Sequence, residues 1–149
     1  MDTTLILENL LNGLQFGLML FLLAAGLTLV FGIMDFINLA HGSLYMAGAY
    51  FAASFAALTG SFWLGLLLAV VATALLGALL EAAVLRRLYQ RDHLSQVLAT
   101  FALILIFNEG ARMIWGAQPV MLNTPPLLSQ PVELLPGFHY SAYRLFLIA

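Results

Sequence analysis

The chain contains no cysteine and no lysine, and Asp, Glu, Lys and Arg together make up only 8% of its 149 residues. Without cysteine, the sequence holds no disulfide, no thiolate metal site and no catalytic thiol. Without lysine, it also lacks a Lys-dependent phosphate loop and the means for Schiff-base chemistry. If ATP drives this protein, another polypeptide must therefore bind the nucleotide.

Scarcity of charge goes with an excess of apolar residues. Hydrophobic residues account for 63% of the chain, and the mean hydropathy is +1.02. A soluble domain of this size covers its surface with polar groups, and this composition does not supply them. The chain is therefore expected to be an integral membrane protein.

Long uncharged runs set the number of membrane crossings. Asn9 to Met34 is a run of 26 residues without Asp, Glu, Lys or Arg, and Phe36 to Leu80 is a run of 45. As helix these runs measure about 39 Å and about 68 Å, against a hydrocarbon core of roughly 30 Å. The first run fits one crossing and the second fits two, divided near Gly60-Ser61. A fourth apolar segment runs from Leu94 to Trp115. The expected fold is an all-α, polytopic transmembrane helix bundle with four spans.

The two ends of the chain differ in character. The residues before the first run include Asp2 and Glu8, whereas a secretory signal has a basic leading region and a short apolar core, so the first span is expected to remain. A fifth span begins at Arg144 and has only six residues before the sequence stops at Ala149. We therefore expect residues 1–149 to be the N-terminal part of one longer transmembrane domain.

Arginines set the expected orientation. Arg86, Arg87 and Arg91 cluster between the third and fourth spans, and cytoplasmic loops carry the excess of Arg and Lys. This places the polar break after the first span on the cytoplasmic side, and it places the N-terminus and the 117–143 segment outside. If the break is re-entrant, or if the region from Phe36 to Leu80 crosses differently, the N-terminus lies on the opposite side of the membrane. All five prolines lie between 119 and 136, which predicts an extended, turn-rich outer segment.

The polar break between the first two runs is the main candidate site. It contains Asp35, Asn38, His41 and Ser43, and polar groups near membrane depth are functional candidates because they are costly there. The simpler interpretation is that Asp35 or Asn38 caps a helix that starts near Ala40. For His41 the simpler interpretation is a packing or hydrogen-bonding role. No metal site is expected, because the other histidines lie in loops on opposite sides of the membrane in this topology.

Small residues predict close helix packing. A seam of alternating three- and four-residue spacings on the second span places small side chains on one face, which favours close helix contact. Gly13 and Gly17 form a GxxxG pair in the first span with the same potential. The seam consists of Gly42, Tyr45, Ala49, Ala52 and Ala56.

Two charged pairs are expected near the membrane interfaces. Glu81 is placed to contact Arg86, and Glu109 is placed to pair with Arg112 on one helix face.

A set of short motifs runs along the chain. Its first members are Asn12-Gly13-Leu14, Ala25-Gly26-Leu27-Thr28-Leu29-Val30-Phe31-Gly32, Ile37-Asn38-Leu39-Ala40-His41-Gly42-Ser43-Leu44-Tyr45-Met46 and Gly48-Ala49-Tyr50. These motifs resemble the opening of the branched-chain amino-acid ABC transporter permeases of the LivH kind. Further matches follow in the family's order at Leu80-Glu81, Leu85-Arg86-Arg87-Leu88, Leu98-Ala99-Thr100-Phe101 and Ile114-Trp115-Gly116. The resemblance thus covers nearly the whole chain.

This resemblance implies a permease subunit, not an enzyme, in a bacterial inner membrane. It implies a second homologous permease subunit, two cytoplasmic ATPase subunits and a periplasmic substrate-binding protein as partners, with no cofactor and no nucleic acid. Family members are longer, and the loop that engages the ATPase lies beyond residue 149. The family also includes urea permeases with a similar Asn-x-Ala-His-Gly segment, so a urea or other small-solute permease is an alternative.

In an alternating-access importer, the polar break is expected to line or support the route of the solute. The residues assigned to it are Asp35, Asn38, His41, Gly42 and Ser43. Two other classes remain open. A secondary transporter needs an ion-coupling acid inside the bundle, for which Asp35 and Glu81 are the candidates. A non-transporting assembly subunit predicts no effect of the break on solute flux. A membrane enzyme is the least favoured class, because no nucleophile–base pair or metal constellation is visible.

Overall fold

The computed structural model describes residues 3–118, 120–122, 124–135 and 138–149. It is mostly helical, and three helical segments are long and apolar enough to cross a membrane: Thr3–Met34, Phe62–Leu88 and His93–Trp115. The chain divides into two compact units, residues 1–24 with 124–149 and residues 25–123. Each unit is described by itself.

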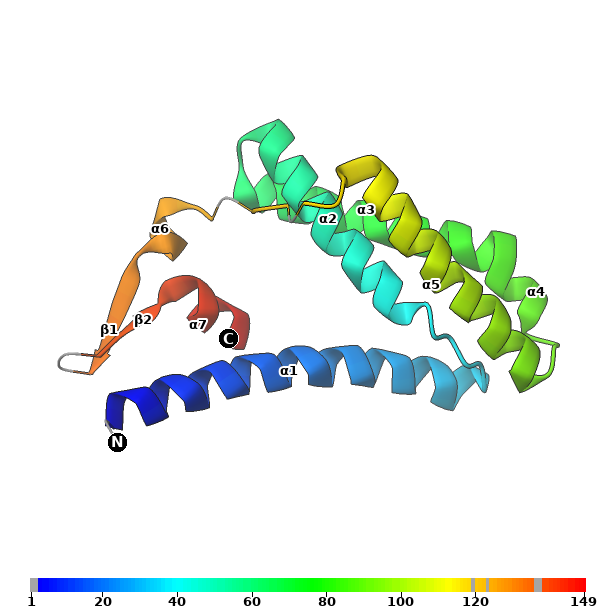
Figure 1. Cartoon of the computed structure of the whole chain (residues 1–149), viewed down its shortest axis with the longest axis horizontal. Coiled ribbons are helices and arrows are strands. Elements are labelled where there is room, and N and C mark those ends of the chain that lie inside the picture. The colour runs from blue at the N-terminus through cyan, green and yellow to red at the C-terminus, as the bar shows by residue number, and fades with distance from the viewer. Residues whose placement is uncertain (1–2, 119, 123, 136–137) are drawn as a thin grey trace. The chain divides into compact units, whose positions relative to one another are not determined.

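The larger unit takes in the end of α1 (Thr3–Met34), then α2 (His41–Thr59) and α3 (Phe62–Leu80), which form an antiparallel hairpin (Figure 1). Gly60 ends α2 with a φ of 65°, a left-handed conformation that glycine adopts without a steric penalty. Ser61 then caps α3, its side chain accepting a hydrogen bond from the Leu64 amide. The division predicted at Gly60-Ser61 is therefore confirmed.

After α3, the helix widens into a π-helical turn, η1 (Glu81–Leu85), and ends in α4 (Arg86–Leu88). Next comes α5 (His93–Trp115), capped by the Asp92 side chain and packed against α2. Four buried residues mark one face of α5 at helical spacing: Gln96, Thr100, Leu103 and Ala111. At the far end of α5, the Trp115 indole N–H donates to Ser54 Oγ at 2.7 Å and its ring stacks on Tyr50.

The smaller unit contains the first part of α1, α6 (Pro126–Ser129), β1 (Pro131–Leu135), β2 (Phe138–Ser141) and α7 (Ala142–Ile148). The strands pair antiparallel, with Val132 opposite Tyr140. The Tyr140 hydroxyl donates to Asn12 Oδ1 at 2.8 Å, and Arg144 donates to the same oxygen. These bonds attach the hairpin and α7 to the start of α1.

The strand pair β1–β2 departs from the expectation of an all-α chain. Prolines in this segment exclude a long helix, as predicted, but the stretch after them alternates. Phe138 and Tyr140 are buried while His139 between them is exposed, which is the period of a strand with one covered face. The proline pattern indicated an extended segment, and this short alternation was the signal for the strand pair.

Candidate functional site

The polar break begins where α1 ends. Asp35 has a φ of 49°, and its amide donates to the Phe31 carbonyl at 2.8 Å, which closes the last turn. Asp and Asn adopt this left-handed conformation more readily than most residues with a Cβ. Asp35 therefore stops α1 and turns the chain into a short non-helical segment, residues 35–40, which we call the break.

The break closes on itself before α2 starts. Asn38 is 5% exposed, and its side-chain oxygen accepts a hydrogen bond from the Ala40 amide at 3.1 Å. The α2 helix starts at His41, and no side chain caps it. The expectation that Asp35 or Asn38 caps this helix is therefore wrong. Because the Asn38 oxygen is taken up by an amide two residues on, it forms a local turn that precedes the helix.

Apolar packing anchors the break. Phe36 is 1% exposed and lies in a core with Ala40, Leu85 and Leu103. Its ring meets the Tyr89 ring edge-on, with centroids 5.2 Å apart. Burial of a Phe side chain stabilises by roughly 1.5–3 kcal/mol. The break is thus fixed against the end of α3–α4 and against α5.

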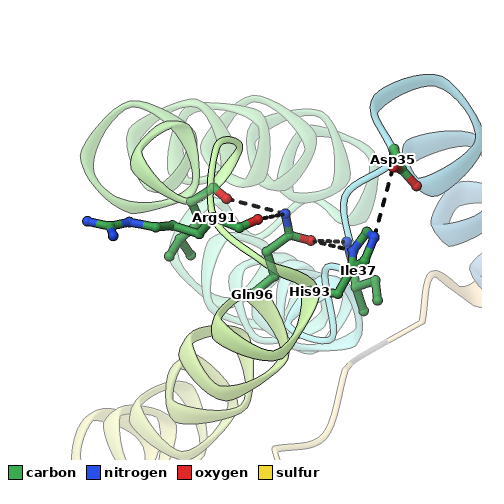
Figure 2. A network of polar contacts seen from close by, with 6 residues as sticks. Asp35, Ile37, Arg91, His93 and Gln96 are labelled. Atoms are coloured by element: carbon green, nitrogen blue, oxygen red, sulfur yellow. Dashed lines mark hydrogen bonds and ion pairs between the residues drawn. The ribbon is translucent and has the colours of Figure 1, made fainter.

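Gln96 is the polar residue that ties the break to this end of the bundle, and sequence analysis missed it. Its Oε1 accepts from the Ile37 amide at 3.2 Å. Its Nε2 donates to the carbonyls of Leu88 at 3.3 Å and Arg91 at 3.1 Å. Figure 2 shows this amide between the turn that carries Arg91 and the backbone at Ile37. The residue is 2% exposed, and its three hydrogen bonds are partly buried.

A second, weaker link joins the same two segments. His93 Nε2 lies 3.9 Å from Asp35 Oδ2, and His93 Nδ1 lies 3.4 Å from Gln96 Oε1 (Figure 2). The His93 and Asp35 side chains are 57% and 81% exposed. Solvent screening makes such pairs worth little. These contacts place the break and the arginine-bearing turn at the same end of the helices, as the predicted topology requires.

The remaining predicted site residues lie at the start of α2. The His41 ring occupies the space beside Gly26 of α1, because a Cβ added to Gly26 would lie 2.7 Å from His41 Nε2. Ser43 is buried and its amide donates to the Ala40 carbonyl at 3.0 Å, whereas Gly42 is exposed. The structure therefore brings His41 to α1, and it directs Asp35 toward His93.

The predicted packing residues of α2 differ in how closely they contact α3. Ala56 lies in the tightest contact between α2 and α3, where a Cβ on Gly65 would fall 2.5 Å from the Ala56 nitrogen. Gly48 faces Thr73 in the same hairpin. Ala52 is half-buried and Ala49 is exposed. The face of α2 used against α3 is thus offset from the predicted seam.

Among the described residues of the smaller unit, no atom lies within 4 Å of a Cβ added at Gly13 or Gly17. Helix packing at this pair stays a prediction.

Two pairs of charged side chains form, one between η1 and α4 and one on α5. The Glu81 carboxylate accepts from Arg86 Nε and Nη2, both at 3.2 Å, which confirms the predicted contact. Glu109 and Arg112 also pair as predicted, at 3.4 Å. The Tyr89 hydroxyl donates to Glu81 Oε1 at 3.3 Å, and burial, together with this carboxylate, raises the pKa of Tyr89. Among the residues that the structure describes, no cluster of His, Cys, Asp or Glu could hold a metal ion.

At the start of α5, Ser95 donates to Asp92 from both its hydroxyl and its amide, at 2.6 and 3.1 Å. These bonds lower the pKa of the Asp92 carboxyl, the hydroxyl having the larger effect. The carboxylate therefore stays ionised while it caps its own helix.

Gln96 had one sequence signal. It is an amide in the first turn of an apolar helix, facing the same side as Thr100 and Leu103. An amide on a buried face needs partners, but the sequence does not say which. Its partner Ile37 is 59 residues away along the chain, so local spacing could not identify the pair.

Comparison with known proteins agrees with the membrane architecture. BraD of Pseudomonas aeruginosa, a high-affinity branched-chain amino acid transport system permease protein, is 50% identical over 46 residues, or 31% of this chain and 15% of BraD. LivH of Escherichia coli K12, described in the same terms, is 46% identical over 44 residues, or 30% of this chain and 14% of LivH. No solved structure matches the chain.

The matched segments therefore cover only a small part of these relatives. A family model extends much further along this chain. The model of the permease component of the branched-chain amino acid transport system matches residues 9–146, which include the break, all three candidate spans except the first residues of α1, and the hairpin. The chain belongs to this family of transport permeases.

Proposed function

We propose that the full-length protein is the transmembrane permease subunit of an ATP-driven importer for branched-chain amino acids, located in a bacterial inner membrane. The observation that carries this proposal is the family match over residues 9–146. The relatives BraD and LivH are both described as branched-chain amino acid permeases, which supports the substrate class. The lack of lysine agrees with ATP binding on a separate subunit.

We propose four spans in this part of the protein and the start of a fifth at α7. The α2 helix is the proposed second span, in addition to the three helical segments named above. It has 19 residues, about 28 Å of helix at 1.5 Å per residue, which is close to a bilayer core of roughly 30 Å. It packs antiparallel against α3, so α2 crosses wherever α3 crosses. The proposed partners are a second homologous permease, two cytoplasmic ATPase subunits, a periplasmic binding protein and the lipid bilayer.

Within this importer, the segment from Asp35 to Ser43 is proposed to support the solute route at its cytoplasmic end. Irregular backbone at such a position needs internal partners, and the break has them in Asn38 and Gln96. His41 packs between α1 and α2, beside Gly26, so it couples these two helices. A rocking motion of the bundle would pass through this contact.

The test is uptake by the complete transporter, assembled with its partner subunits in proteoliposomes. We expect leucine uptake that requires ATP and that persists when an ionophore collapses the ion gradient. Uptake that follows the ion gradient without ATP would refute the importer in favour of a secondary transporter. Uptake of urea without leucine would refute the substrate class.

A variant at His41, the first residue after the break, tests the role of the segment from Asp35 to Ser43. His41→Ala should lower the uptake rate while the complex still assembles, because it empties the contact beside Gly26. His139→Ala is the matched control, since His139 is an exposed residue of β2 outside the break. Normal uptake and normal assembly of the His41→Ala complex would remove His41 from the proposed route.

A further inference from the structure

Gln96 of α5 links the end of α4 and the turn between α4 and α5 to the break, which lies 59 residues earlier in the chain at Ile37. We propose that Gln96 is a positioning residue that holds the break docked on this turn, so that the break moves together with α5 during transport. The docking is a property of the chain alone. Its consequence for transport rests on the function proposed above.

The hydrogen-bond pattern specifies an amide at this position. Ile37 presents an N–H, whereas Leu88 and Arg91 present carbonyl oxygens. Only a side chain with an acceptor on one terminal atom and two N–H donors on the other terminal atom pairs with all three backbone groups. The same pattern fixes the amide orientation, because the flipped amide would place donor against donor and acceptor against acceptor. A carboxylate at residue 96 would face two carbonyl oxygens, and an apolar side chain would leave three partly buried backbone groups without this partner.

Other contacts at the break cannot set its position equally well. Phe36 supplies burial, but the free energy of burying apolar area has no preferred direction. The pair of His93 and Asp35 is exposed and 3.9 Å apart. Hydrogen bonds from a buried side chain are directional, and the three that Gln96 makes are partly shielded from competing water. The register of the break on the turn therefore depends on Gln96.

Thr100 supports this arrangement from α5. It is fully buried, and its hydroxyl donates to the Gln96 carbonyl at 2.8 Å. The residue that carries the amide is thus itself fixed within the core face of α5. A fixed base is what a positioning residue needs, because loss of its side chain then frees the break and leaves α5 in place.

The experiment uses the full-length permease in its assembled transporter. Ala40 lies in the break and is 0% exposed, so Ala40→Cys gives a thiol that reacts only when the break opens, and its labelling rate reports that opening. This part of the chain contains no other cysteine, and any cysteine beyond it is replaced. The variants are Gln96→Met, which keeps size and removes all three bonds, and Gln96→Glu, which keeps an acceptor for Ile37. Gln90→Met is the matched control, because Gln90 is exposed in the same turn.

We expect Gln96→Met to raise the labelling rate about tenfold, as loss of roughly 1.4 kcal/mol of docking free energy would. Gln96→Glu should fall between Gln96→Met and the unmodified protein, and Gln90→Met should not change the rate. The maximal uptake rate of Gln96→Met should fall about tenfold while the half-saturating leucine concentration stays within about twofold, because Gln96 positions the break and does not contact the solute.

Unchanged labelling in Gln96→Met would overturn the proposal whatever the uptake rate. A large change in half-saturating concentration would also overturn it, because this would indicate solute contact. If Gln96→Met does not assemble, Gln96→Glu decides by the same two criteria. Failure of the proposed function can be told apart from failure of the docking proposal. If the proposed function is wrong, the transporter with Gln96 intact lacks ATP-dependent leucine uptake, and the labelling comparison still tests the docking.

Discussion

Replacement of Gly65 by alanine tests the close approach of α2 and α3. A Cβ at residue 65 would lie 2.5 Å from the Ala56 nitrogen, 2.6 Å from its Cα and 2.8 Å from its Cβ. Ordinary contact begins at 3.4 Å, so the helices must separate locally by about 0.9 Å, the difference between 3.4 and 2.5 Å. Two of the three atoms are backbone, so no side-chain rotation relieves the clash.

The energetic consequence has two opposing parts. Overpacking of this kind costs about 1–3 kcal/mol. Alanine is favoured over glycine inside a helix by up to about 1 kcal/mol. We expect the overpacking to prevail, because separation at Gly65 also loosens the contact of Gly48 with Thr73 farther along the hairpin. The predicted net loss of unfolding free energy is about 1–2 kcal/mol.

The assay is unfolding of the purified full-length permease in mixed detergent micelles, followed by circular dichroism. Gly110→Ala in α5 is the matched control, because an added Cβ there meets no atom within 4 Å. Ala56→Gly in the Gly65→Ala background should restore only part of the stability, since it removes the Cβ contact and leaves the two backbone contacts. Equal stability of Gly65→Ala and Gly110→Ala would refute the close approach.

Two further predictions concern the core and the α5 cap. Phe36→Ala should lower the unfolding free energy by about 3–5 kcal/mol, because Phe36 is 1% exposed; a loss no larger than that of an exposed residue would contradict this. Asp92→Ala should lower the thermal midpoint at pH 7, since it removes the two bonds from Ser95. Because those bonds lower the Asp92 pKa below 3.8, the stabilisation is present above that value and is lost as pH falls through the lowered pKa. The thermal midpoints of Asp92→Ala and of the unmodified protein should therefore converge in acid. A difference that does not change with pH would refute the role of the Asp92 carboxylate.

The sequence by itself determined the class of protein and the local elements. Composition and uncharged run length depend only on which residues are present, and they indicated membrane helices divided at Gly60-Ser61. The pairs Glu81 with Arg86 and Glu109 with Arg112 are close along a helix, so periodicity was enough to predict them. The motifs around the break led to the permease family because they are contiguous in the chain.

Only the tertiary structure decided which surfaces meet. Which face of α2 packs on α3 depends on the approach of a second helix, so the contact at Ala56 and Gly65 could not be read from the small residues of α2 alone. The bond between Gln96 and Ile37 spans 59 residues, and each side chain or backbone group looks ordinary in its own segment. Local sequence fixes helix period and polarity, whereas the choice of partner for a buried polar group is settled by packing.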